Sequence, residues 1–239
     1  MATHTTTPHL PAPGDSHGSH AGHPPGFAHQ FEDMEQQLDS TVLGMWIFLA
    51  QEIMFFGGMF AGYAIYRFRN QDAFAAASNH LDITLGGFNT VVLIASSLTM
   101  ALAVRAAMMG ENRKIVRFLT LTLILGFTFL GVKVVEYTDK FTHHLVPGYN
   151  FSWPDAGLAS GAQMFYVFYF VMTGMHALHM IIGAGLLLYF IRKAMQNTYH
   201  TEYYGPIENM GLYWHFVDII WIFLFPLLYL LGLHLGKGH

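Results

Sequence analysis

The sequence predicts an all-α integral membrane protein, a bundle of five transmembrane helices that follows a disordered, histidine- and proline-rich amino-terminal tail. Composition gives the class: 53% of the 239 residues are hydrophobic and only 11% are charged, whereas about a quarter of an ordinary soluble domain is charged. The apolar residues also gather in five runs of about 20 residues or more, the length that crosses a bilayer as a helix.

The first 40 residues differ in composition from the rest of the chain. Prolines, glycines and serines are mixed there with six histidines: His4, His9, His17, His20, His23 and His29. Such a segment can neither bury a core nor sustain a helix. We therefore expect residues 1–40 to form a disordered tail and residues 41–239 to form one transmembrane domain.

The five helices are expected near 42–68, 84–109, 115–139, 162–192 and 208–235. A short polar link that contains Asn70 separates the first two, and a turn at Gly110 separates the second from the third. The third connection contains Pro147 and Pro154, and the fourth ends near Pro206. Glycine and proline interrupt helices, so these positions mark the boundaries.

The basic residues predict the orientation. With the amino terminus inside, the inner ends and loops hold six of them and the outer ones four. The inner set is Arg105, Arg113, Lys114, Arg117, Arg192 and Lys193, and the outer set is Arg67, Arg69, Lys140 and Lys237. Lys and Arg accumulate on the cytoplasmic side, which predicts a cytoplasmic amino terminus and a periplasmic or extracellular carboxyl terminus.

The absence of cysteine excludes disulfides and thiolate metal sites.

Ionisable residues inside the predicted helices are candidates for function, because a charge in hydrocarbon is costly. Glu52 falls near the middle of the first helix and is either functional or bonded to a neighbouring helix, with Ser96 or Ser97 as partner. Lys133 and Glu136 are spaced to form an i, i+3 ion pair. The sequence favours a neutralised structural pair there over a proton path.

Two histidine motifs leave alternatives open. His176 and His179 share a helix face and could hold a metal or a haem, with His215 as a ligand from a facing helix, or could be hydrogen-bonded core residues. His215 and Asp218 lie one turn apart and can pair with each other. Small residues at Gly58 and Gly62, and in the pairs Gly126 with Gly131 and Gly183 with Gly185, predict close helix packing.

Taken together, motifs in all five helices resemble subunit III of the haem-copper respiratory oxidases, over about residues 40–236. They are Gln51-Glu52 with Phe55-Phe56, Phe88 to Ser97, Gly110-Glu111-Asn112-Arg113, Leu125-Gly126 through Glu136-Tyr137, Thr173 to His179, and Tyr213-Trp214-His215-Phe216-Val217-Asp218 with Trp221 and Phe223. The mitochondrial type of subunit III has seven helices. A chain with five helices therefore resembles the shorter bacterial form of the subunit, which lies in the inner membrane. Lys133 departs from the glutamine that the family commonly carries.

The resemblance implies an accessory role in oxygen reduction, most closely in a cytochrome c oxidase. Subunit III of these enzymes holds no haem or copper, which belong to partner subunits, so we expect no catalytic residue, no metal and no cofactor here, apart from structural phospholipid. The implied partners are subunit I as the main contact, subunit II, other oxidase subunits and membrane lipids, with no nucleic acid.

The resemblance also implies roles for individual residues. Glu52 is expected to be an intramembrane carboxylate at the contact with subunit I. The polar interior and interface of the bundle are expected to consist of Asn89, Ser96, Glu136, His176, His179, Trp214, His215 and Asp218. Arg113 and Glu208 are expected to contact lipid headgroups.

Three alternatives remain at this point. The chain could serve a quinol oxidase or a nitric oxide reductase that carries a similar five-helix protein. It could conduct protons on its own through Glu52. It could also bind haem through His176, His179 and His215.

Overall fold

The computed structural model describes residues 34–148, 151–199, 203–230 and 232. Over these residues the chain forms helices and no strands: α1 (Met34–Arg69), α2 (Gln71–Ser78), α3 (Ile83–Met108), α4 (Asn112–Thr142), α5 (Ala159–Met195) and α6 (Gly205–Tyr229). Five of them, all except α2, are long and apolar enough to cross a membrane. The prediction of a five-helix all-α membrane bundle is thereby confirmed.

The boundaries of the helices differ from the predicted ones in three ways. Helix α1 begins at Met34, so residues 34–40 are helical and do not belong to a disordered tail; residues 1–33 lie outside the described part of the chain. The predicted polar link after α1 contains the short helix α2, whose alanines favour a helix. Helices α4 and α5 each extend three residues further at both ends than predicted, whereas α6 begins three residues earlier and already ends at Tyr229, before the predicted end near 235.

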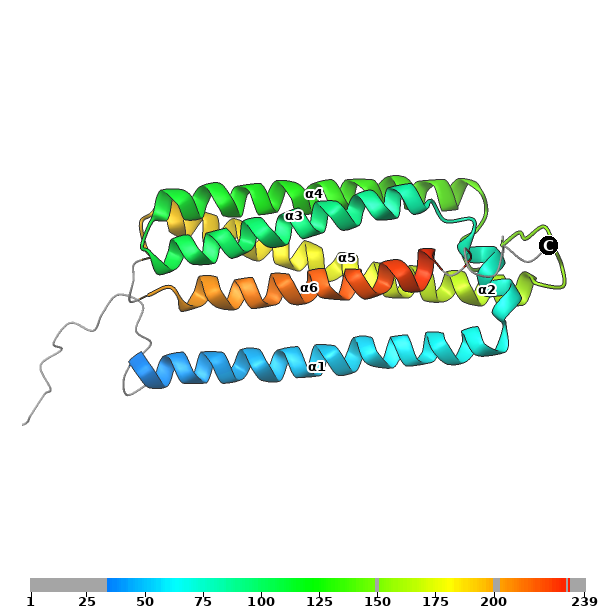
Figure 1. Cartoon of the computed structure of the whole chain (residues 1–239), viewed down its shortest axis with the longest axis horizontal. Helices are drawn as coiled ribbons and strands as arrows, with labels where there is room; N and C mark the ends of the chain where they lie inside the picture. Colours follow the sequence, from blue (N-terminus) through cyan, green and yellow to red (C-terminus); the bar gives the residue numbers. More distant parts are fainter. Residues whose placement is uncertain (1–33, 149–150, 200–202, 231, 233–239) are drawn as a thin grey trace, which may run out of the picture.

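The five long helices run alternately up and down along one axis (Figure 1). Helix α3 packs against α4 and α6, and α5 packs against α4 and α6. Helix α1 lies at the edge of this group, where it contacts α5 and α6, and α2 covers one end of α5. Helices α5 and α6 are therefore the central pair, because α6 touches α1, α3 and α5, and α5 touches α1, α2, α4 and α6.

Three helices end in the same backbone motif. Gly110, with φ 70°, follows α3, and the amide of the next residue, Glu111, donates to the Ala106 carbonyl at 3.0 Å. His144 and Asn197, both with φ 55°, follow α4 and α5 in the same way. This Schellman arrangement satisfies carbonyl groups that have no partner inside the helix. It allows tight turns at the ends of the bundle.

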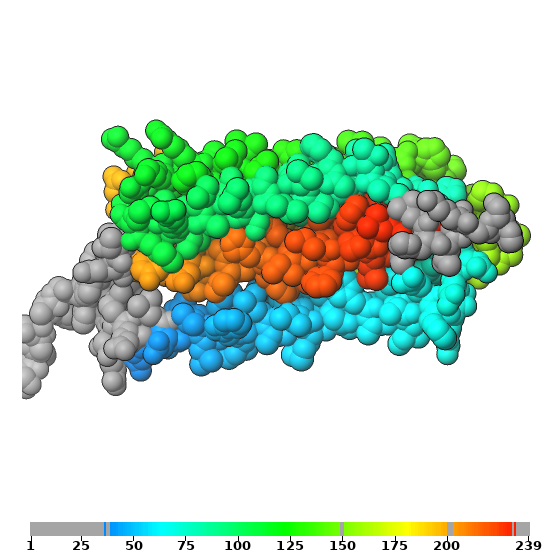
Figure 2. Space-filling view, in the orientation of Figure 1, coloured from blue at the N-terminus to red at the C-terminus, as the bar shows by residue number. Residues whose placement is uncertain are grey.

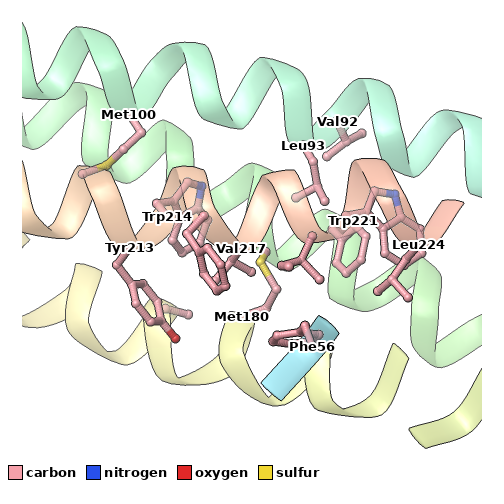
Figure 3. Packing of buried hydrophobic residues seen from close by; sticks show 14 of the residues in the cluster. Phe56, Val92, Leu93, Met100, Met180, Tyr213, Trp214, Val217, Trp221 and Leu224 are labelled. Atoms are coloured by element: carbon pink, nitrogen blue, oxygen red, sulfur yellow. The ribbon is translucent and has the colours of Figure 1, made fainter. Parts of the chain in front are cut away.

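The core is built around two tryptophans of α6, which point between the other helices (Figure 3). Both Trp214 and Trp221 are fully buried. A Cβ placed at Gly126 of α4 or Gly183 of α5 would come within 3.1 or 3.0 Å of the Trp214 ring. The predicted close approach is thus correct for these two glycines, whereas no atom lies within 4 Å of a Cβ at Gly131 or Gly185.

The carboxyl end of α6 is held by side chains from the start of the chain. The Tyr63 hydroxyl of α1 donates to the Leu227 carbonyl at 2.8 Å, and the Ser78 hydroxyl of α2 donates to the Leu228 carbonyl at 2.7 Å. Carbonyls in the last turn of a helix need partners from outside the helix. These bonds dock α1 and α2 onto the bundle.

Candidate functional site

A carboxylate and an imidazole join α1 to α5 inside the membrane-spanning region. One Glu52 oxygen lies 3.1 Å from Nε2 of His179, and the Glu52 side chain is nearly buried. Nδ1 of the same ring lies 2.8 Å from the Met175 carbonyl oxygen. The prediction that Glu52 bonds a neighbouring helix is correct in kind, but its partner is His179 and neither Ser96 nor Ser97.

The hydrogen bonds of His179 restrict the protons that this pair can hold. A carbonyl only accepts hydrogen bonds, so Nδ1 must donate to Met175. Nε2 then either accepts a proton from a neutral Glu52 or donates one to its carboxylate. In both arrangements the pair has no net charge and shares one proton, which is how a low-dielectric interior tolerates two ionisable groups.

A second buried cluster surrounds Lys133 of α4. Its Nζ donates to Glu136 at 2.8 Å and to the Tyr229 hydroxyl at 2.9 Å, and the Tyr229 hydroxyl donates to the other Glu136 oxygen. The predicted i, i+3 ion pair is therefore present, with 3% of Lys133 and 2% of Glu136 exposed. Tyr229 links this pair on α4 to the end of α6.

Aromatic rings enclose the same ammonium group. Nζ of Lys133 lies 4.9 Å from the Trp221 ring centroid and 5.2 Å from that of Tyr169. Two more rings, those of Tyr137 and Tyr229, lie within 5.6 Å of it. Aromatic faces attract cations, so these rings compensate part of the hydration that Lys133 loses. The cluster neutralises its own charges internally.

His176 and Asn89 are buried without full hydrogen bonding. Neither ring nitrogen of His176 has a hydrogen-bond partner among the described residues, and the ring packs 5.3 Å from both Phe129 and Trp221. The Asn89 amide donates to the Phe129 carbonyl at a long 3.5 Å, and its oxygen lacks a described partner. His176 and His179 thus sit in different surroundings although they share a helix.

A third polar group lies between α3 and α6. Nδ1 of His215 is 2.7 Å from the Ser97 hydroxyl, so this ring bonds another helix. The local pairing expected from the sequence would have required a bond to Asp218 instead. Beside it, the indole of Trp214 donates to the Ser96 hydroxyl at 2.9 Å. Asp218 borders the same space as Ser97 and His215, and 3% of it is exposed.

The histidine-based metal and haem interpretation finds no support in this geometry. Among the described residues no three His, Cys, Asp or Glu side chains gather closely enough to hold a metal ion. His179 bonds Glu52 and His215 bonds Ser97.

Arg113 and Glu208 are exposed in the first turns of α4 and α6, which lie at the same end of the bundle (Figure 1).

Sequence reasoning missed several partners of the predicted residues. Tyr229 and Tyr169 complete the Lys133 cluster, and Ser97 is the partner of His215. A buried lysine near the end of a membrane helix requires acceptors, and tyrosine hydroxyls on facing helices could supply them. That requirement indicates a type of residue, but it does not identify which tyrosine.

The chain is similar in sequence to known proteins over the whole described bundle. A family model described as cytochrome c oxidase subunit III matches residues 33–233. Cytochrome c oxidase subunit 3 of Synechocystis sp. is 32% identical over 221 residues, which cover 92% of this chain and 81% of that protein. The subunit 3 of Thermostichus vulcanus is 32% identical over 86% of this chain and 94% of its own length. Quinol oxidase subunit 3 of Bacillus subtilis is 32% identical over 84% and 93%.

Proposed function

The chain belongs to the cytochrome c oxidase subunit III family, and we propose that it is the non-catalytic accessory subunit of a proton-pumping cytochrome c oxidase in a bacterial inner membrane. The observation that carries this proposal is the family match over residues 33–233. The buried ionisable groups support it, because Glu52, Lys133 and Glu136 have their partners within the chain. Such groups stabilise a bundle, and substrate chemistry belongs to the partner subunits.

In this proposal Glu52 contributes to assembly through His179. Its carboxylate points to α5, and the pair fixes α1 on the bundle. The bundle in turn stabilises subunit I, shelters the start of its proton uptake path and contacts subunit II and other oxidase subunits. The haems and copper that reduce oxygen to water belong to those partners.

A lipid role is part of the same proposal. An apolar groove of about 410 Å³ lies between the start of α1, the end of α5 and the start of α6, lined among others by Met45, Phe190 and Pro206. We propose that it holds a phospholipid acyl chain, with the headgroup at the end of the bundle where Glu208 lies in the first turn of α6; Arg113, in the first turn of α4, does not border this groove. By the distribution of basic residues, this end faces the cytoplasm.

The electron donor gives the second candidate function. Relatives named as cytochrome c oxidase and quinol oxidase subunits match at the same identity, 32%. A quinol oxidase is therefore the alternative, and a nitric oxide reductase is a more distant one. Purification of this chain with an affinity tag from its native membrane, followed by identification of the co-purified subunits, separates the three.

The expected result is co-purification with a haem- and copper-containing subunit I and a subunit II that carries the electron-entry copper. A subunit II without copper would assign the quinol enzyme, and a nitric oxide reductase subunit would refute the oxidase proposal.

A second measurement tests independent activity: the chain alone, in proton-tight vesicles, is expected to leave the proton gradient intact. A leak that the Glu52→Gln variant abolished would instead favour a proton conductor.

A further inference from the structure

A groove runs along the seam between α3 and α6, which lie side by side on one face of the molecule (Figure 2). Its volume is about 440 Å³. Apolar side chains, among them Leu98, Ile219 and Ile222, form most of its wall, and the remainder consists of Ser97, His215 and Asp218. We call it the Asp218 groove.

Asp218 is unusual in this groove because its carboxylate is unsatisfied. Its side chain is 3% exposed, and neither oxygen has a well-aligned hydrogen-bond partner among the described residues. The nearby Ser97 hydroxyl bonds Nδ1 of His215 at 2.7 Å, and because a hydroxyl carries a single proton it can supply at most one of the donors that two carboxylate oxygens accept. A buried acceptor without a partner costs about 1–3 kcal/mol. The groove thus presents a hydrogen-bonding need.

The depth of Asp218 restricts what can meet this need. Asp218 lies midway along α6, which spans Gly205–Tyr229, so at 1.5 Å per residue it is roughly 18 Å from either end. Ser97 lies similarly near the middle of α3. The hydrocarbon core is about 30 Å thick, so lipid headgroups stay far from this level. An acyl chain can fill the apolar wall but offers no hydrogen bond.

We propose that the Asp218 groove receives a transmembrane helix of another subunit of the oxidase complex, and that this helix places a hydrogen-bond donor opposite Asp218 at mid-membrane. This inference rests on the proposed function, because it requires a partner subunit. Polar side chains bond across helices in membranes, and an apolar groove with one convergent polar group suits a helix that carries one polar residue among apolar ones.

Photo-crosslinking in the assembled complex tests the occupant directly. A diazirine amino acid is placed at Leu98 or Ile222 in the groove, and at Val134 of α4, which is 64% exposed outside it. After illumination of native membranes, we expect the two groove positions to give adducts with one oxidase subunit, and Val134 to give mainly lipid adducts. Lipid adducts alone at both groove positions would overturn the proposal.

Two substitutions of Asp218 test the hydrogen bond. Asp218→Leu removes the acceptor and is expected to reduce the co-purified partner at least fivefold, which corresponds to about 1 kcal/mol. Asp218→Asn keeps a carbonyl acceptor and is expected to retain most of the partner. The isolated Asp218→Leu chain should remain folded, because a buried polar group without a partner is replaced by an apolar one; a monodisperse elution in detergent checks this.

The outcomes separate this inference from the proposed function. If the wild-type chain brings down the oxidase subunits but Asp218→Leu brings down as much, no partner donor binds Asp218, the inference fails and the accessory role stands. If the wild-type chain brings down no oxidase subunit, the proposed function fails, and the groove assignment fails with it.

Discussion

Lys133 carries its charge inside the bundle with 3% of its surface exposed. Lys133→Met would leave Glu136 with Tyr229 as its remaining partner in the cluster, and we expect the free energy of unfolding to fall by about 3–5 kcal/mol, the usual cost of breaking a buried pair. Lys133→Gln keeps a donor for Glu136 and should cost less. Denaturation of the purified chain in mixed detergent micelles measures both.

The matched double variant Lys133→Met with Glu136→Leu serves as the control. Removing both charges should recover a large part of the loss, because an apolar pair of similar size needs no compensation. Equal losses for Lys133→Met and the double variant would mean that packing by the lysine stem, and not the ion pair, stabilises the site.

The Glu52 and His179 pair is expected to depend on hydrogen bonding more than on charge. Because Nδ1 donates to Met175, a neutral ring presents Nε2 as an acceptor. Glu52→Gln can donate to it and should leave the melting temperature almost unchanged, whereas Glu52→Leu leaves Nε2 unpartnered and should cost about 1–3 kcal/mol. The exposed neighbour Gln51, changed to Leu, is the control. Equal destabilisation by Gln and Leu would instead indicate an imidazolium and carboxylate pair.

At the scale of helices, packing around Trp214 depends on two glycines. Gly183→Ala places a methyl group 3.0 Å from the rings of Trp214 and Tyr213, so the rings must move and the indole bond to Ser96 lengthens. We expect a loss of about 1–3 kcal/mol, typical of overpacking. Gly185→Ala, two residues away with no atom within 4 Å of the new methyl, should cause no loss. Thermal unfolding compares them, and equal effects would refute the packing account.

The docking of α1 gives a second prediction at this scale. Tyr63→Phe removes the donor to the Leu227 carbonyl at the end of α6, and the buried carbonyl should cost about 1–3 kcal/mol. Tyr66→Phe, on an exposed ring three residues later, is the control. Protease cleavage in the α1 to α2 segment should increase only for Tyr63→Phe. Unchanged cleavage would show that aromatic packing alone holds α1.

What the sequence could predict depends on whether interactions are local. The five spans follow from runs of apolar residues, and the Lys133 to Glu136 pair follows from helical spacing. Helix α2 was not predicted because its eight residues hold an apolar run, Ala73 to Ala77, that is far too short to span a membrane. The partners of Glu52 and His215 are 127 and 118 residues away. Periodicity tells which face of a helix is polar, but not which helix that face meets.

For the whole molecule, the orientation can be tested without prior engineering, because the chain contains no cysteine. Single substitutions therefore report their own side of the membrane. Glu111→Cys lies in the turn before α4, among the basic residues Arg113 and Lys114, and His143→Cys lies at the opposite end of α4. In intact cells a membrane-impermeant maleimide should label His143→Cys at once and Glu111→Cys only after permeabilisation. Six basic residues against four give only a modest bias for this orientation. The reverse labelling pattern would invert the orientation and place the proposed lipid groove in the outer leaflet.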